Sequence, residues 1–76
     1  MQHLDFKLKP SKDANEPFIE LNKLLKFMKL SENGAMANVF ISDGLVKVNG
    51  KTDLRKRAKI RKGDVVVFED STIQVQ

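Results

Sequence analysis

The spacing of the apolar residues changes at Gly44, and this change constrains the fold more than any other feature of the chain. Before Gly44, large apolar residues recur three and four positions apart, which is the period of one helix face. These residues are Phe18, Leu21, Leu24, Leu25 and Met28. After Gly44, Val46 and Val48 alternate with Lys47, which is the period of a half-buried strand. The chain is therefore expected to form helices before Gly44 and strands after it.

Two helices are predicted before Gly44. The first begins at residues 15–17 (Asn-Glu-Pro), because proline is tolerated in a first helical turn and an acid suits the positive end of the dipole. The second is capped by Ser31 and ends near Asp43, with Gly44 in the left-handed position that follows the helix. Its inner face is expected to carry Met36, Ala37, Phe40 and Ile41.

Gly34 is unusual in the first turn of the second helix, because glycine there costs roughly 0.5–1 kcal/mol relative to alanine. Two interpretations stay open. Glycine permits close packing of the two helices, or it leaves bare backbone N–H groups that can meet a phosphate.

Short strands surround the helices. In chain order we expect a strand at residues 4–8, a loop at 10–15, a strand at 46–48, a hairpin turn at Asn49-Gly50, a turn at 62–64, a strand at 65–68, a turn at 69–71 and a strand at 72–75. This order predicts an α+β fold, a two-helix hairpin packed on a small curled, mainly antiparallel sheet. Because 76 residues leave no room for a second core, we expect residues 1–76 to form a single domain.

Eight of the fourteen basic side chains fall in residues 47–62, which we call the basic segment. Asp53 is the one acid there, so eight bases and one acid give the segment a net charge of +7. A charge gathered in this way favours a polyanion as ligand, because each Lys or Arg at a phosphate releases counterions. The alternative is a solvated loop that keeps a sheet edge soluble. Such surfaces usually intersperse both signs, however.

Other classes of function lack the residues that they need. Without cysteine the chain has no disulfides, thiolate metal sites or cysteine nucleophiles. The single His3 cannot build a metal site or a catalytic pair by itself. Five of the ten acidic residues fall in turns or loops where solvation explains them; they are Asp43, Asp53, Asp64, Glu69 and Asp70. We therefore expect no catalysis, no cofactor and no metal.

No apolar run approaches the roughly 20 residues of a membrane span, and the N-terminus has no signal-peptide core. We therefore expect a cytoplasmic protein. We also expect a monomer, because the sequence has no large unexplained apolar patch.

The ordered motifs resemble the RNA-binding domain of the small-subunit ribosomal protein four (S4) family. They are an apolar helix at residues 21–30, a second helix at 34–41 followed by Gly44, Val-Lys-Val-Asn-Gly at 46–50 and Lys-Gly-Asp-Val at 62–65. The resemblance covers about residues 16–69 and, with the flanking strands, the whole chain. Residues 31–37 and 55–60 are most similar to small stand-alone bacterial members that consist of this domain alone. The resemblance implies an alpha-L motif, in which a two-helix hairpin and the following β-loop present a basic surface to structured RNA.

The chain departs from the larger members of the family at two positions. Gly34 stands where those members commonly have an arginine, and Asn38 stands where a basic residue often follows the alanine of the second helix. The basic segment is therefore expected to carry more of the RNA contact.

We accordingly expect a non-catalytic module that binds structured RNA (ribosomal RNA, tRNA or small RNA) and is associated with ribosomal particles. RNA is favoured over DNA because the chain offers no basic recognition helix for a major groove. Base stacking on aromatic rings is not expected, because at least four of the five phenylalanines are needed for the core. These are Phe6, Phe18, Phe40 and Phe68.

The expected RNA contacts fall into three groups. Arg55 and Arg57 would clamp phosphates bidentately. Lys47, Lys51, Lys56, Lys59, Arg61 and Lys62 would act as point charges, and Asn49 could donate to sugar or base edges. Secondary contacts are expected from Asn33, Gly34 and Asn38.

The alternative from a different class is an adaptor that uses the same basic surface to bind acidic proteins or anionic membranes. A polybasic loop near anionic lipid gains about 1 kcal/mol per Lys or Arg. A peripheral membrane protein normally adds Trp, Phe or Leu beside its basic face. After Val48 the basic segment has only Leu54 and Ile60 as large apolar residues, so no membrane is expected as partner.

Overall fold

The computed structural model describes residues 2–8 and 17–76. The loop expected at residues 10–15 and the helix start expected at Asn15 and Glu16 lie outside these ranges. The elements of the described residues are, in chain order, β1 (Gln2–Phe6), β2 (Ile19–Glu20), α1 (Leu21–Phe27), α2 (Gly34–Ser42), β3 (Val46–Val48), β4 (Lys51–Thr52), β5 (Lys59–Ile60), β6 (Val65–Phe68) and β7 (Ser71–Val75).

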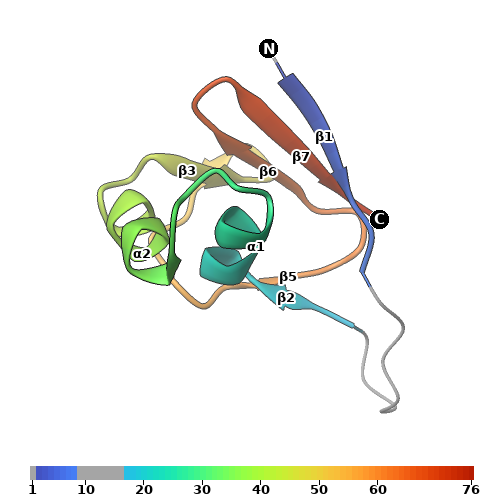
Figure 1. Cartoon of the computed structure of the whole chain (residues 1–76). Helices are drawn as coiled ribbons and strands as arrows, with labels where there is room; N and C mark the ends of the chain where they lie inside the picture. Colours follow the sequence, from blue (N-terminus) through green and yellow to red (C-terminus); the bar gives the residue numbers. More distant parts are fainter. Residues whose placement is uncertain (1, 9–16) are drawn as a thin grey trace.

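Five of the strands form one sheet in the order β1-β7-β6-β3-β4. Every pair in it is antiparallel except β1 with β7, where Gln2 lies opposite Ser71 and Phe6 opposite Val75. Figure 1 shows β1 and β7 side by side, with both helices on one side of this sheet. The chain thus has the expected α+β fold, with a two-helix hairpin on a mainly antiparallel sheet.

The strand β2 is a correction to the sequence-based prediction, which placed residues 19–20 inside the first helix. Ile19 instead pairs with Ile60 of β5, and Glu20 pairs with Lys59. The helix α1 begins only at Leu21, whose backbone N–H donates to the Ala58 carbonyl over 2.9 Å. A partner about forty residues away in the sequence therefore overrides the local signals for a helix start.

The core lies between the helices and the two sheets. In Figure 1, α1 lies between the large sheet and the β2/β5 pair. The buried apolar residues are Leu21, Leu24, Leu25, Ala37, Ile41, Val46, Ala58, Ile60, Val66, Phe68, Ile73 and Val75. Phe6 and Phe40 are half-buried against this core, and Phe40 stacks on Phe68 with ring centroids 4.9 Å apart.

Two residues expected in the core are exposed. Phe18 is 45% exposed because it precedes β2 and is not part of a helix face. Met36 is 40% exposed, since α2 turns only Ala37 and Ile41 fully inward. Neither side chain is buried in the core beneath the two-helix hairpin.

The predicted C-terminal end of α2 is confirmed, whereas the predicted N-cap is wrong. The N-cap is Asn33, whose side-chain oxygen accepts from the Met36 backbone N–H over 2.9 Å, and Ser31 is buried ahead of it. At the other end Gly44 has the expected positive φ of 78°, and its N–H donates to the Ile41 carbonyl. That combination ends the helix with a left-handed residue.

Close packing does not explain Gly34. A Cβ atom at Gly34 would meet nothing within 4 Å, so the two helices leave open space there. Of the two interpretations of this glycine, the structure contradicts the one based on packing.

Candidate nucleic-acid interface

The middle of the basic segment is attached to the N-terminal end of α1. The first N–H groups of a helix have no partner within the helix. Here Leu21 donates to the Ala58 carbonyl and Asn22 to the Lys56 carbonyl, over 2.9 and 3.0 Å. These bonds give two N–H groups of the helix end a partner and hold residues 56–58 against it, so Lys56 and Arg57 project from an anchored backbone.

The two ends of the basic segment are tied together by Asn49. Asn49 and Gly50 have φ of 53° and 85°, which suits a two-residue type I′ turn between β3 and β4. The Asn49 side chain donates to Asp64 Oδ1 over 3.0 Å and accepts from the Val65 N–H over 2.9 Å. Asp64 Oδ2 in turn accepts from the Arg61 N–H. Much of the hydrogen-bonding capacity of Asn49 is therefore used inside the protein.

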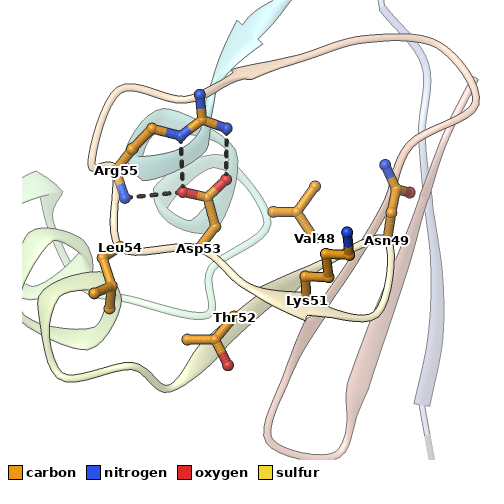
Figure 2. Close-up of a pocket in the computed structure, with 7 residues that line it drawn as sticks. All are labelled: Val48, Asn49, Lys51, Thr52, Asp53, Leu54 and Arg55. Atoms are coloured by element: carbon orange, nitrogen blue, oxygen red, sulfur yellow. Dashed lines mark hydrogen bonds and ion pairs between the residues drawn. The ribbon is translucent and has the colours of Figure 1, made fainter.

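Two open hollows lie along the basic segment, and Arg55 lines both of them. The first, drawn in Figure 2, has a volume of about 760 Å³ and is lined by Val48, Asn49, Lys51, Thr52, Asp53, Leu54 and Arg55. The second has a volume of about 450 Å³ and is lined by Arg55, Arg57, Ala58, Lys59 and Arg61. Arg55 therefore contributes to the lining of both hollows.

Arg55 is held by Asp53 in this position. Its Nε–H donates to Asp53 Oδ1 over 3.1 Å and its Nη2–H donates to Oδ2 over 2.9 Å, as the dashed lines of Figure 2 show. The backbone N–H of Arg55 also donates to Oδ1. The hydrogen bonding from the Arg55 side chain, with a smaller effect from its backbone N–H, lowers the pKa of Asp53. The side-chain hydrogen bonding and the charge of Asp53 raise the pKa of Arg55. The sequence suggested that Asp53 is a solvated loop acid. In the structure it is instead the hydrogen-bond acceptor that holds Arg55.

A second carboxylate reaches the basic segment from β2. Glu20 forms an ion pair with Lys23 at 2.9 Å and a longer one with Arg57 at 3.7 Å. The hydrogen bond from Lys23 is the main reason that the pKa of Glu20 is lowered, and Arg57 adds to the effect. Sequence reasoning missed Glu20 because it lies far from the segment in the chain, although strand pairing places it opposite Lys59.

The structure brings most, but not all, of the expected contact residues together. All eight basic residues of the segment are exposed. Six of the nine main candidates line the two hollows, and these are Asn49, Lys51, Arg55, Arg57, Lys59 and Arg61. Lys47, Lys56 and Lys62 line neither.

The three secondary candidates lie at or on α2, apart from both hollows. Asn33 caps that helix, and Asn38 Oδ1 accepts a hydrogen bond from Asn22 of α1 over 3.0 Å. Asn38 therefore has a structural partner that the sequence did not indicate. Gly34 is half-buried at the first position of the helix.

Two apolar side chains beside the basic segment were not foreseen as surface features. Leu54 is 59% exposed in the first hollow, whereas Ile60 is buried in the core. Phe18 is the second, and the ammonium of Lys59, a residue that lines the second hollow, lies 5.1 Å from the centroid of its ring. Their exposure depends on the β2/β5 pairing and the course of the loop, for which the sequence carries no clear signal.

Within residues 2–8 and 17–76, no group of three His, Cys, Asp or Glu side chains could hold a metal ion. In these two ranges no helix has the length and apolar character that crossing a membrane requires.

Comparisons with known proteins concern the chain as a whole. The family model described as the S4 domain matches residues 13–76. "Putative RNA-binding protein YbcJ" of Escherichia coli (strain K12) is 46% identical over 62 residues, which are 82% of this chain and 89% of the relative. The same identity and coverage are found with "Uncharacterized protein YbcJ" of Shigella flexneri.

A solved structure is also similar. The solution structure of YbcJ from E. coli, described as revealing an alpha-L motif involved in RNA binding, superposes with a TM-score of 0.62. The superposition covers 99% of this chain and 86% of that chain at 37% sequence identity. The match therefore extends over the whole fold, and the expected resemblance is confirmed.

Proposed function

Because this chain belongs to the S4 domain family, we propose that it binds structured RNA through its basic segment. The observation that carries the proposal is the second hollow, in which Arg55, Arg57, Lys59 and Arg61 converge on one open surface. A phosphate backbone is the polyanion that such a row of exposed cations suits. The E. coli relative that covers most of this chain carries RNA binding in its name.

The proposed contacts follow the geometry. Arg57 and the free edge of Arg55 bind phosphates, because a guanidinium can form paired hydrogen bonds with phosphate oxygens. Lys51, Lys59 and Arg61 supply further charge from the walls of the two hollows. The flanking positions Lys47, Lys56 and Lys62 extend the surface, and Asn49 supplies its remaining amide N–H. Asn33, Gly34 and Asn38 form a secondary contact on the α2 side.

The wider role is proposed on the same basis. We propose that residues 1–76 form a single RNA-binding domain that acts as a non-catalytic, monomeric module in the cytoplasm. Ribosomal RNA, tRNA and small RNA are the candidate ligands, and ribosomal particles are the candidate assemblies. No cofactor enters this mechanism, because charge and shape complementarity supply the affinity.

The test is a salt titration of binding to an RNA hairpin and to a DNA duplex of matched sequence. The wild type is compared with the triple variant Arg55→Ala, Lys56→Ala, Arg57→Ala. We expect tighter binding to RNA, and a salt slope reduced by about two to three units in the variant, because three phosphate contacts are lost.

A charge-matched control removes three exposed lysines elsewhere, through Lys7→Ala, Lys26→Ala and Lys29→Ala. Both variants have the same net charge, so only a local contact makes the first weaker than the second. Equal, weak binding of wild type and both variants to RNA and DNA would refute the proposal. Thermal unfolding of each variant excludes loss of fold as the cause.

An adaptor for anionic membranes is the second candidate, and exposed Leu54 is the observation that favours it. An apolar side chain beside exposed cations is typical of peripheral membrane binding. Co-sedimentation with phosphatidylserine vesicles tests this. Stronger binding to vesicles than to RNA at the same salt would reverse the ranking.

A further inference from the structure

The outer face of the β2/β5 pair carries an aromatic ring among charged groups. Ile19 and Ile60 lie opposite one another, and Ile60 is buried, so both point toward the core. Successive side chains of a strand point to opposite faces. The neighbours Phe18, Glu20 and Lys59 therefore share the face toward solvent, where Phe18 and Lys59 are exposed.

Phe18 is one of six large apolar residues that are exposed in the described part of the chain; the others are Phe27, Met36, Val39, Leu45 and Leu54. Phe18 is 45% exposed, although a chain of this length needs nearly all of its large side chains in the core. The Lys59 ammonium lies 5.1 Å from the ring centroid, which is within the range of a cation–π contact. The Lys59 ammonium therefore lies over the ring, and 45% of the residue is open to solvent.

Another exposed phenylalanine has different surroundings. Phe27 is 68% exposed, but its ring meets Phe6 of β1 edge to face at 5.2 Å. It extends an aromatic cluster against the large sheet. Exposure alone thus does not single out Phe18; its position beside the cations does.

Lys59 links the Phe18 ring to the second hollow. The same side chain lies over the ring and lines the hollow with Arg57 and Arg61. An aromatic face next to cations that track a backbone is the arrangement that proteins use for unpaired nucleotides, because every base can stack while its phosphate is neutralised.

We propose that Phe18 stacks on an unpaired nucleobase of the bound RNA, while Lys59 and Arg61 contact the phosphates beside that base. The inference rests on the proposed function and specifies its ligand. Bases within a paired helix stack on one another and leave no face for Phe18. The preferred RNA is therefore a helix with a bulged or single-stranded nucleotide beside it.

The experiment uses two blunt-ended RNA duplexes that differ by a single bulged 2-aminopurine, a fluorescent base whose emission falls when it stacks. Wild type, Phe18→Ala and Phe18→Trp are compared, with Phe27→Ala as a matched loss of an exposed ring. We expect Phe18→Ala to weaken binding of the bulged duplex on the order of 10-fold and to leave the fully paired duplex unchanged. Phe18→Trp and Phe27→Ala retain wild-type affinity, and only Phe18→Ala abolishes the quenching.

The outcomes separate this inference from the proposed function. If the wild type binds both duplexes through the basic segment, and Phe18→Ala binds them equally well, the stacking inference is wrong and RNA binding stands. An equal loss on both duplexes in Phe18→Ala would also overturn it, since that pattern means a structural role. If the wild type binds neither duplex, the proposed function fails first. A defect of Phe18→Ala on phosphatidylserine vesicles but not on RNA would overturn the inference in favour of a membrane wedge.

Discussion

Asp53 and Arg55, two residues apart, form a bidentate ion pair in which the acid is nearly buried and the base is exposed. The Asp53 side chain is 11% exposed and that of Arg55 is 79% exposed. The carboxylate accepts the Nε–H and one Nη2–H of Arg55. A guanidinium has five donors in a fixed plane. The ion pair therefore fixes the orientation of the guanidinium and leaves three of its N–H donors free. These three donors can bind a further acceptor, such as a phosphate oxygen.

The ion pair between Asp53 and Arg55 predicts whether the substitution Asp53→Asn strengthens or weakens RNA binding. Asp53→Asn raises the net charge by one unit, so a surface that acts by charge alone would bind RNA more tightly and with a steeper salt slope. We expect weaker binding instead. Releasing Arg55 adds an ordering cost on binding of about 0.5–1.5 kcal/mol, the usual cost of immobilising one long side chain. Fluorescence anisotropy on an RNA hairpin measures the difference.

The matched control for Asp53→Asn is Asp70→Asn. Asp70 is an exposed acid between β6 and β7, and its side chain makes no hydrogen bond or ion pair within the described part of the chain. It changes net charge equally without touching Arg55. Tighter binding by the Asp53 variant, equal to that of the control, would show that Asp53 merely neutralises the surface.

The same pair predicts how stability depends on pH. Folding lowers the pKa of Asp53 below its ordinary value of 3.8, chiefly through the hydrogen bond from the Arg55 side chain. A group with a lowered pKa stabilises the fold above its unfolded pKa. That contribution is lost as the pH falls from 3.8 through the lowered value. We expect the difference in unfolding free energy between wild type and Asp53→Asn to be constant near neutral pH and to shrink below 3.8, as measured by urea denaturation.

Asn49 is predicted to be important for stability through both its backbone and its side chain. Asn49→Gly keeps the positive φ but loses the bonds to Asp64 and Val65, at a cost of about 1 kcal/mol. Asn49→Ala adds the strain of a left-handed alanine, about 1 kcal/mol more. Urea unfolding should rank wild type above the glycine variant and the alanine variant last. An alanine variant as stable as the glycine variant would contradict the proposed turn strain.

Gly34→Ala is expected to stabilise the protein. The added methyl group meets nothing within 4 Å, and Gly34 is the first residue of α2. Replacing glycine by alanine at a compatible helical position raises stability by about 0.4–1 kcal/mol, mainly by restricting the unfolded chain. A higher melting temperature in calorimetry supports this, and a lower one would mean that the first turn has a conformation that alanine does not tolerate.

Much of the fold followed from short-range patterns. The period of three and four predicted the buried residues of α1, the alternation after Gly44 predicted β3, and the β-branched run at 65–68 predicted β6. Gly44 and Asn49-Gly50 predicted where the chain adopts positive φ, because those conformations are local requirements of a helix end and a hairpin. These signals depend on neighbours within a few residues, so sequence reasoning can detect them.

The candidate site was predictable in its charge but not in its geometry. The eight cations of the basic segment were visible in the sequence, and all of them are exposed. Which of these cations form ion pairs within the protein depends on Asp53 and Glu20. The turn at residues 53–55 brings Asp53 to Arg55, and strand pairing brings Glu20 near Arg57. No periodic pattern in the sequence predicts either of these two contacts.

The sequence by itself determined the two helices, the hairpin and the concentration of positive charge in residues 47–62. Periodicity, turn chemistry and charge are properties of nearby residues, and this is the physical reason. Only the tertiary structure decided that β2 replaces the first turn of the expected helix, that Phe18 stays at the surface and that Arg55 is held by a carboxylate. These features arise where β2, the start of α1 and the basic segment meet, because hydrogen-bond partners and burial there come from residues far apart in the chain.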